Sequence, residues 1–180
     1  MTRISTRDGV LFALLVGLAV ATRLLPHPPN FTALVAVSLL AGWVFRSRVL
    51  AACVPMAAML LSDAVIGGYS LGIMIAVYAG LLVPLAMRRL IGDGRCAWRI
   101  GGAAALSSLA FFVVSNGAVW AFGTMYARDA GGLLACYVAA VPFFKWQLAG
   151  DLLYSGALFG LAAVMPRAVA TVRGLVPVGA

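Results

Sequence analysis

Long apolar stretches, separated by short clusters of arginine, glycine and proline, restrict what this chain can fold into. A helix that crosses a bilayer needs about 20 mostly apolar residues. Six stretches of the sequence approach or reach that length, at residues 9–25, 31–45, 49–66, 70–87, 100–122 and 146–165. We therefore predict an all-α integral membrane protein in which residues 1–180 form a single domain of six transmembrane helices.

A seventh apolar stretch, residues 131–144, falls short of a full span. It is interpreted in one of two ways. It forms a short re-entrant or interfacial helix of its own, or it extends the sixth span with a kink at Pro142.

The charge content supports a membrane protein. Charged residues make up 10% of the 180 residues and hydrophobic residues 64%, whereas a soluble domain carries roughly 25% charged residues. A net charge of +8 would suggest a nucleic-acid partner in a soluble protein. Because no basic run exceeds the pair Arg88–Arg89, we expect membrane lipid and no nucleic acid.

The basic residues are divided unevenly between the two sides of the predicted helices. With six spans, three of the thirteen basic residues fall on one side, namely Arg23, Arg128 and Lys145. The other ten are Arg3, Arg7, Arg46, Arg48, Arg88, Arg89, Arg95, Arg99, Arg167 and Arg173. Since cytoplasmic loops collect Arg and Lys, we predict cytoplasmic termini and a multi-pass location in the bacterial inner membrane.

Motifs of catalysis and nucleotide binding are missing from the sequence. It contains no HExxH, GxSxG or GxxxxGK pattern and only one histidine. The three cysteines, Cys53, Cys96 and Cys136, are scattered and form no CxxC metal site. We therefore expect no enzyme activity and no intrinsic cofactor, and the chain has no motif with which to hydrolyse ATP.

Two aspartates in or near apolar helices require an explanation, because a carboxylate is costly at membrane depth. Asp63 lies near the outer end of its span. It is either a helix-end carboxylate that reaches water or an acceptor in an outward-facing pocket. Gln147, Asp151 and Tyr154 share one helix face, because they are spaced at i, i+4 and i+7. This face either binds a neighbouring helix through polar contacts or lines a cavity.

The predicted outer connections hold most of the remaining polar chemistry. His27 lies in a proline-rich connection, where a neutral imidazole can accept a hydrogen bond or coordinate a metal. Ser115 and Asn116 of the fifth span are placed to reach the same region. We predict that the ligand is held by His27, Asn30, Asp63, Tyr69, Arg128, Asp151 and Tyr154.

Small residues recur at four-residue spacing in the first span, at Ala13, Gly17 and Ala21. Such a stripe lets another helix approach closely. We interpret it either as a docking face for a partner helix or as packing within the chain.

Several short motifs together resemble a known family. They are RLLPHPPNFT at residues 23–32, LSD at 61–63, SN at 115–116, CYVAAVPFF at 136–144 and GDLLY at 150–154. Over about residues 20–165 the chain resembles the substrate-binding S-components of energy-coupling-factor vitamin transporters, and most closely the BtuM-type cobalamin transporter family.

The resemblance implies an outward-facing pocket for a vitamin, with cobalamin or another corrinoid as the transported ligand and an energy-coupling ATPase module as a partner. In the cobalamin branch a cysteine near the fourth span ligates cobalt and assists decyanation. This chain has no cysteine near Tyr78–Gly80, so His27 is the expected cobalt ligand instead. The alternatives are carriage of another vitamin or a nucleobase-like molecule, an intramembrane enzyme that pairs His27 with Asp63, and a structural membrane subunit.

Overall fold

The structure, a computed structural model, describes residues 5–92 and 96–175, with side chains up to Val164. Every regular element in these ranges is a helix. The helices are α1 (Thr6–Leu24), α2 (Leu34–Val44), α3 (Arg48–Ile66), α4 (Leu71–Gly80), α5 (Val83–Ile91), α6 (Ala97–Phe122) and α7 (Ala130–Leu175). The prediction of an all-helical protein is confirmed for this part of the chain.

Four helical segments among the described residues are long and apolar enough to cross a membrane. They are Arg48–Ile66, Leu71–Ile91, Ala97–Phe122 and Ala130–Val164. The shorter helix α2 is also apolar, whereas α1 carries three charged residues, Arg7, Asp8 and Arg23. The chain is therefore a membrane protein with several apolar helices, and six spans and the orientation of the termini stay predictions.

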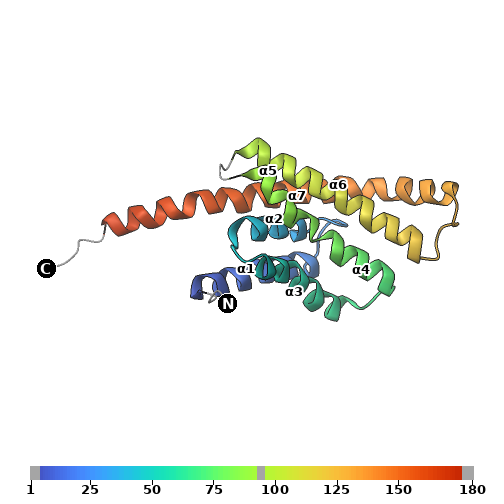
Figure 1. Ribbon diagram of the computed structural model, residues 1–180, viewed down its shortest axis with the longest axis horizontal. Coiled ribbons are helices and arrows are strands. Elements are labelled where there is room, and N and C mark those ends of the chain that lie inside the picture. Colours follow the sequence, from blue (N-terminus) through green and yellow to red (C-terminus); the bar gives the residue numbers. More distant parts are fainter. Residues whose placement is uncertain (1–4, 93–95, 176–180) are drawn as a thin grey trace.

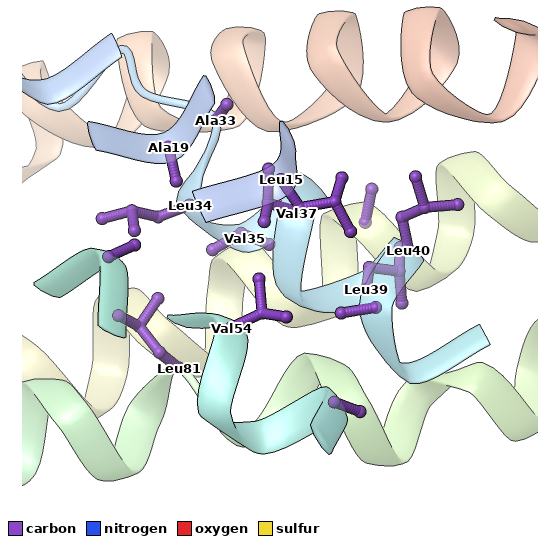
Figure 2. Packing of buried hydrophobic residues seen from close by; sticks show 14 of the residues in the cluster. Leu15, Ala19, Ala33, Leu34, Val35, Val37, Leu39, Leu40, Val54 and Leu81 are labelled. Atoms are coloured by element: carbon purple, nitrogen blue, oxygen red, sulfur yellow. The ribbon is translucent and has the colours of Figure 1, made fainter. Parts of the chain in front are cut away.

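Helix α2 lies at the centre of the bundle. It packs against α1, α3, α5, α6 and α7, and all of residues 34–42 are buried. Figure 2 shows its side chains close to Leu15 and Ala19 of α1 and to Val54 of α3. A helix that is apolar on every face is suited to this central position, where it meets other helices on all sides.

The predicted second span, residues 31–45, is longer than the helix that forms. Helix α2 has 11 residues, which corresponds to about 16 Å at 1.5 Å per residue. A hydrocarbon core is about 30 Å thick, so α2 alone does not cross it. Residues 25–30 of the connection that precedes α2 are exposed, and burial begins only at Phe31.

The predicted fourth span, residues 70–87, falls within the candidate span Leu71–Ile91, but a turn divides that span into two helices. Helix α4 ends at Gly80, Leu81 and Leu82 form a turn, and α5 begins at Val83. Pro84 occupies the first turn of α5. It lacks a backbone N–H, and inside a continuous helix its ring would collide with the carbonyl of Gly80.

The predicted short helix 131–144 and the predicted sixth span 146–165 are one helix, α7, of 46 residues. The interpretation of residues 131–144 as a separate short helix was therefore wrong, and they extend the sixth span. The polar triplet Lys145–Trp146–Gln147 suggested a boundary, but no glycine or proline lies in it to interrupt the backbone hydrogen bonds. Lys145 is exposed on the side of this helix. Of the three basic residues predicted on the outer side, Arg23 lies in the last turn of α1 and Arg128 lies on the α6–α7 connection. Lys145 lies within α7 and not on a connection.

The molecule is elongated, with α7 as its longest helix (Figure 1). The start of α1, the end of α5 and the end of α7 lie toward the left of this view, and the α3–α4 and α6–α7 connections lie toward the right. Arg3 and Arg95 of the predicted cytoplasmic set lie outside the described residues, as do the side chains of Arg167 and Arg173 and the terminal residues themselves.

Candidate functional site

A cavity of about 410 Å³ opens among the helices at the end of the bundle where α1 and α3 finish and α4 begins. Its apolar walls come from residues such as Val35, Met59, Ile73 and Phe111. Polar side chains from five separate segments converge on it. They are Arg23, His27, Asn30, Thr32, Tyr69, Ser115, Asn116, Gln147 and Asp151.

On one wall, an ion pair joins the end of α1 to the end of α3. Nη1 of Arg23 donates to Oδ1 of Asp63 at 2.8 Å and also to the hydroxyl of Ser62. The hydroxyl of Tyr78 on α4 donates to Oδ2 of Asp63 at 3.0 Å. The Asp63 side chain is only 9% exposed. Its charge is therefore balanced and hydrogen-bonded, which is what a carboxylate at this depth requires.

Tyr69 lies on the connection between α3 and α4 and lines the cavity. Burial and the nearby Asp63 carboxylate raise the pKa of its hydroxyl, and the Arg23 guanidinium opposes this shift. The hydroxyl therefore stays protonated under physiological conditions. It presents a neutral hydrogen-bonding group to anything in the cavity.

His27 and Asn30 lie at the mouth of the cavity, on the connection that follows α1. The ring nitrogens of His27 lie near two backbone carbonyls, with Nδ1 at 2.7 Å from Pro28 O and Nε2 at 3.3 Å from Arg23 O. The backbone of Asn30 has a φ of 63°, a conformation that asparagine tolerates better than most residues. His27 can coordinate a metal only after its ring leaves one of these carbonyls. Among the described residues no group of three His, Cys, Asp or Glu side chains could hold a metal ion.

The opposite wall is formed by the packed faces of α6 and α7. Nε2 of Gln147 donates to the backbone oxygen of Ser108 at 2.8 Å and to its hydroxyl at 3.1 Å. That hydroxyl also interacts with the side chain of Asp151. Asp151 is only 2% exposed. Its Oδ2 atom has no hydrogen-bond partner in the described part of the chain.

Three of the predicted ligand-binding residues do not line the cavity. Asp63 lies behind Arg23, and the other two lie further away. Arg128 follows the end of α6 and donates to the backbone oxygens of Trp120 and, at 2.6 Å, Gly123. It therefore caps the free carbonyls of that helix. Tyr154 shares the helix with Asp151 but packs against Phe31, with ring centroids 5.6 Å apart, and does not line the cavity.

The predicted docking stripe faces outward from α1. Ala13 and Gly17 are exposed and Ala21 is half-buried. A Cβ atom added at Gly17 would meet no atom within 4 Å. Gly17 is therefore not packed against another helix of the described chain.

Several residues important to the cavity escaped the sequence argument. The missing partners of Asp63 were Arg23 and Tyr78, and the missing partner of Gln147 and Asp151 was Ser108. Adjacent serines within an apolar stretch are a visible signal, but only the packing of α6 on α7 shows which side chains they meet. Ser115 and Asn116, which were predicted to reach the region of His27, line the same cavity as His27.

These features define a class: a helical membrane protein with an open, largely apolar cavity lined by a few polar side chains. More particularly, the chain belongs to the family of unknown function DUF6580, whose model matches residues 3–172. No curated protein matches the chain. No solved structure matches it either.

Proposed function

We propose that this protein is a membrane uptake protein, similar in its mode of action to a transporter S-component, which binds a vitamin-sized organic molecule in the cavity. The observation that carries this proposal is the convergence of polar side chains from five segments on one largely apolar cavity. Small-molecule sites are typically concave, mostly apolar and equipped with a few polar groups that orient the ligand. The volume of about 410 Å³ falls within the range of roughly 300–1,000 Å³ that such sites occupy.

The direction of uptake rests on charge. The described arginines between α2 and α3 and at the end of α5 belong to the helix ends opposite the cavity. If these arginines face the cytoplasm of a bacterial inner membrane, the cavity opens toward the periplasm. A ligand would then enter near His27 and Asn30.

A corrinoid is the first ligand to test. His27 at the mouth is the only histidine, and a turn of its ring would free a nitrogen for cobalt. A corrinoid is much bulkier than the cavity, so its macrocycle would rest at the mouth and only one edge would enter. A smaller vitamin would fit inside completely and is the alternative.

Energy for uptake could come from a partner. The exposed stripe of Ala13 and Gly17 on α1 leaves room for a helix of an energy-coupling ATPase module to approach closely. Leucines at Ala13, Gly17 and Ala21 would then impair transport and spare ligand binding.

The test is to purify the full chain in detergent and to identify co-purifying small molecules by mass spectrometry, with cyanocobalamin added as a probe in a parallel sample. Ser115→Phe places a ring in the cavity, and we expect it to lower the bound ligand at least about tenfold, or 1.4 kcal/mol. Val113→Phe is the matched control, because Val113 is an exposed residue of the same helix. Equal ligand in the two variants would place the binding site elsewhere.

A further inference from the structure

The α6–α7 interface buries a carboxyl group that the ligand cavity alone does not explain. Asp151 is 2% exposed, and the flanking serines Ser107, Ser108 and Ser155 are at most 1% exposed. Oδ2 of Asp151 and the hydroxyls of Ser107 and Ser155 lack hydrogen-bond partners within the described residues. Buried polar groups normally have hydrogen-bond partners. Three buried polar atoms without one, all on the α6–α7 interface, therefore suggest a site that binds and releases a proton.

No cation balances Asp151. The ion pair among the described residues is the one between Arg23 and Asp63, and Arg23 is therefore already neutralised on the far wall. The helices packed against α7 are α2 and α6. Neither α2 nor residues 100–122 of α6 contain an ionisable side chain.

Tyr154 shares the helix face of Asp151. The remaining titratable groups that face Asp151 do so across the cavity. They are Arg23, His27 and Tyr69, which line the same space, with Asp63 held behind Arg23. A lone carboxylate in a low-dielectric interior costs several kcal/mol. A neutral carboxyl group avoids this cost, and it can donate one hydrogen bond as well as accept others.

Asp151 also lies between two cavities. It lines the outer cavity, whereas Ser155, one turn further along the same face of α7, lines a second cavity of about 270 Å³. That second cavity is bounded by the start of α6, including Ala97 and Ile100, and by Phe159 of α7. It therefore reaches toward the opposite end of the bundle.

We propose that Asp151 is a proton-binding site that links the outer cavity to this second cavity, and that proton movement through it is coupled to ligand uptake. The coupling rests on the proposed uptake function, whereas the proton site itself does not. Water in the outer cavity transfers a proton to the Asp151 carboxylate, which becomes a neutral carboxyl group. The carboxyl O–H bond later breaks as the proton passes to water beside Ser155, and the carboxylate is restored.

Gln147 and Ser108 act as positioning residues in this scheme. Gln147 fixes the Ser108 hydroxyl from one side, and that hydroxyl meets the Asp151 side chain from the other. Serine hydroxyls can both donate and accept, so this pair serves either form of the carboxyl group. The chain thereby has a means of coupling of its own, in addition to any partner that binds α1.

The first measurement is infrared difference spectroscopy of the full-length protein in lipid vesicles, between acidic and alkaline buffers. We expect the carbonyl band of a protonated carboxyl group to disappear as the pH rises, and to be missing throughout in Asp151→Asn. Asp129→Asn, on the α6–α7 connection, is the matched control and should keep the band. A band that persists in Asp151→Asn, or one that responds to sodium at constant pH, would overturn the proposal.

The second measurement follows protons directly. Vesicles contain a pH-sensitive dye, the membrane voltage is clamped with potassium and valinomycin, and the outside is acidified. The wild type and Asp129→Asn should acidify the interior faster than protein-free vesicles, and Asp151→Asn should lose this component. Equal rates in wild type and Asp151→Asn would contradict the proton path.

Two further variants keep the test decisive if Asp151→Asn fails to fold. Asp151→Glu keeps a titratable group and should keep the band, and Ser155→Ala should keep the band but slow the proton flux. Unchanged flux in Ser155→Ala would remove the second cavity from the path. If the wild type shows the band but no ligand co-purifies with it, the uptake function fails and the proton site stands.

Discussion

Two aspartates lie on opposite sides of the cavity, Asp151 in its lining and Asp63 behind Arg23, and they are held in different ways. Asp63 at the end of α3 receives hydrogen bonds from Arg23 and Tyr78. Asp151 in the middle of α7 is more deeply buried, at 2% exposure against 9%, and has serine and no cation beside it. The first arrangement suits a permanent negative charge, and the second suits a neutral carboxyl group.

This difference explains how an apolar bundle keeps both carboxyl groups. A balanced pair at a helix end stabilises one geometry, because breaking it exposes each charge to a medium that solvates it poorly. A neutral carboxyl group costs less to bury and binds its surroundings weakly. Asp63 is therefore expected to stabilise the fold, and Asp151 is expected to exchange a proton.

The largest effect should come from breaking the balanced pair. Arg23→Ala leaves the Asp63 carboxylate buried without its cation, and we expect the free energy of unfolding to fall by about 3–5 kcal/mol. Denaturant titration in detergent, followed by tryptophan fluorescence, measures it. Arg128→Ala is the control, since that exposed arginine donates only to backbone oxygens. A loss no greater than that of the control would mean that the ion pair is not stabilising.

A smaller loss is expected when only one hydrogen bond to Asp63 is removed. Tyr78→Phe deletes the donor at 3.0 Å from Oδ2, which should cost about 2 kcal/mol because the acceptor is charged. Tyr137→Phe deletes a hydroxyl that donates to the neutral carbonyl of Val113 at 2.7 Å, which should cost about 1 kcal/mol. The same unfolding titration compares the two, and the reverse order would show that Asp63 is not ionised.

On the wall formed by α6 and α7 the hydrogen bonds join neutral groups, so each should contribute less to the free energy of unfolding. Gln147→Leu removes both bonds to Ser108, and we expect a loss of about 1 kcal/mol together with a change in the carboxyl band of Asp151. Unfolding titration and infrared spectroscopy on one preparation test both parts. A loss as large as that of Arg23→Ala would show that this wall is as tightly organised as the first.

The smallest change in stability is expected at Asp151 itself. Asp151→Asn exchanges one neutral group for another of similar shape, so the free energy of unfolding should change by less than about 1 kcal/mol at neutral pH. Asp63→Asn, the same exchange on the other wall, should cost several times more. Equal losses for the two would remove the distinction between the aspartates.

The sequence was informative wherever the argument depended on composition or on local backbone chemistry. The apolar stretches correctly predicted helices for the described residues, because a run of about 20 apolar residues has the length of a membrane-spanning helix and exceeds that of a spanning strand. Helix ends also agreed closely where glycine, proline or a capping serine marked them, as at Ser47 before α3 and Gly67 after it. Charge alone marked a false boundary at Lys145, because a single polar triplet does not break a helix.

The candidate site depended more heavily on the fold. The cost of an unpaired carboxylate in lipid already singled out Asp63 and Asp151 in the sequence. Nothing in the spacing revealed that Arg23 neutralises the first, 40 residues away in the chain, or that Ser108 lies beside the second. Arg128 was predicted from its place on the outer side and Tyr154 from its helical spacing to Asp151, yet neither lines the cavity.

The sequence by itself determined that this chain is apolar, helical and in need of partners for its two membrane-embedded acids, since these follow from transfer free energies of individual residues. Only the tertiary structure decided which partners they obtain. Helix packing brings Arg23 to Asp63 and leaves Asp151 among serines, and the direction in which each side chain points depends on the rotation of whole helices about their axes. That rotation is set by the sum of many contacts around α2, and no single residue encodes it.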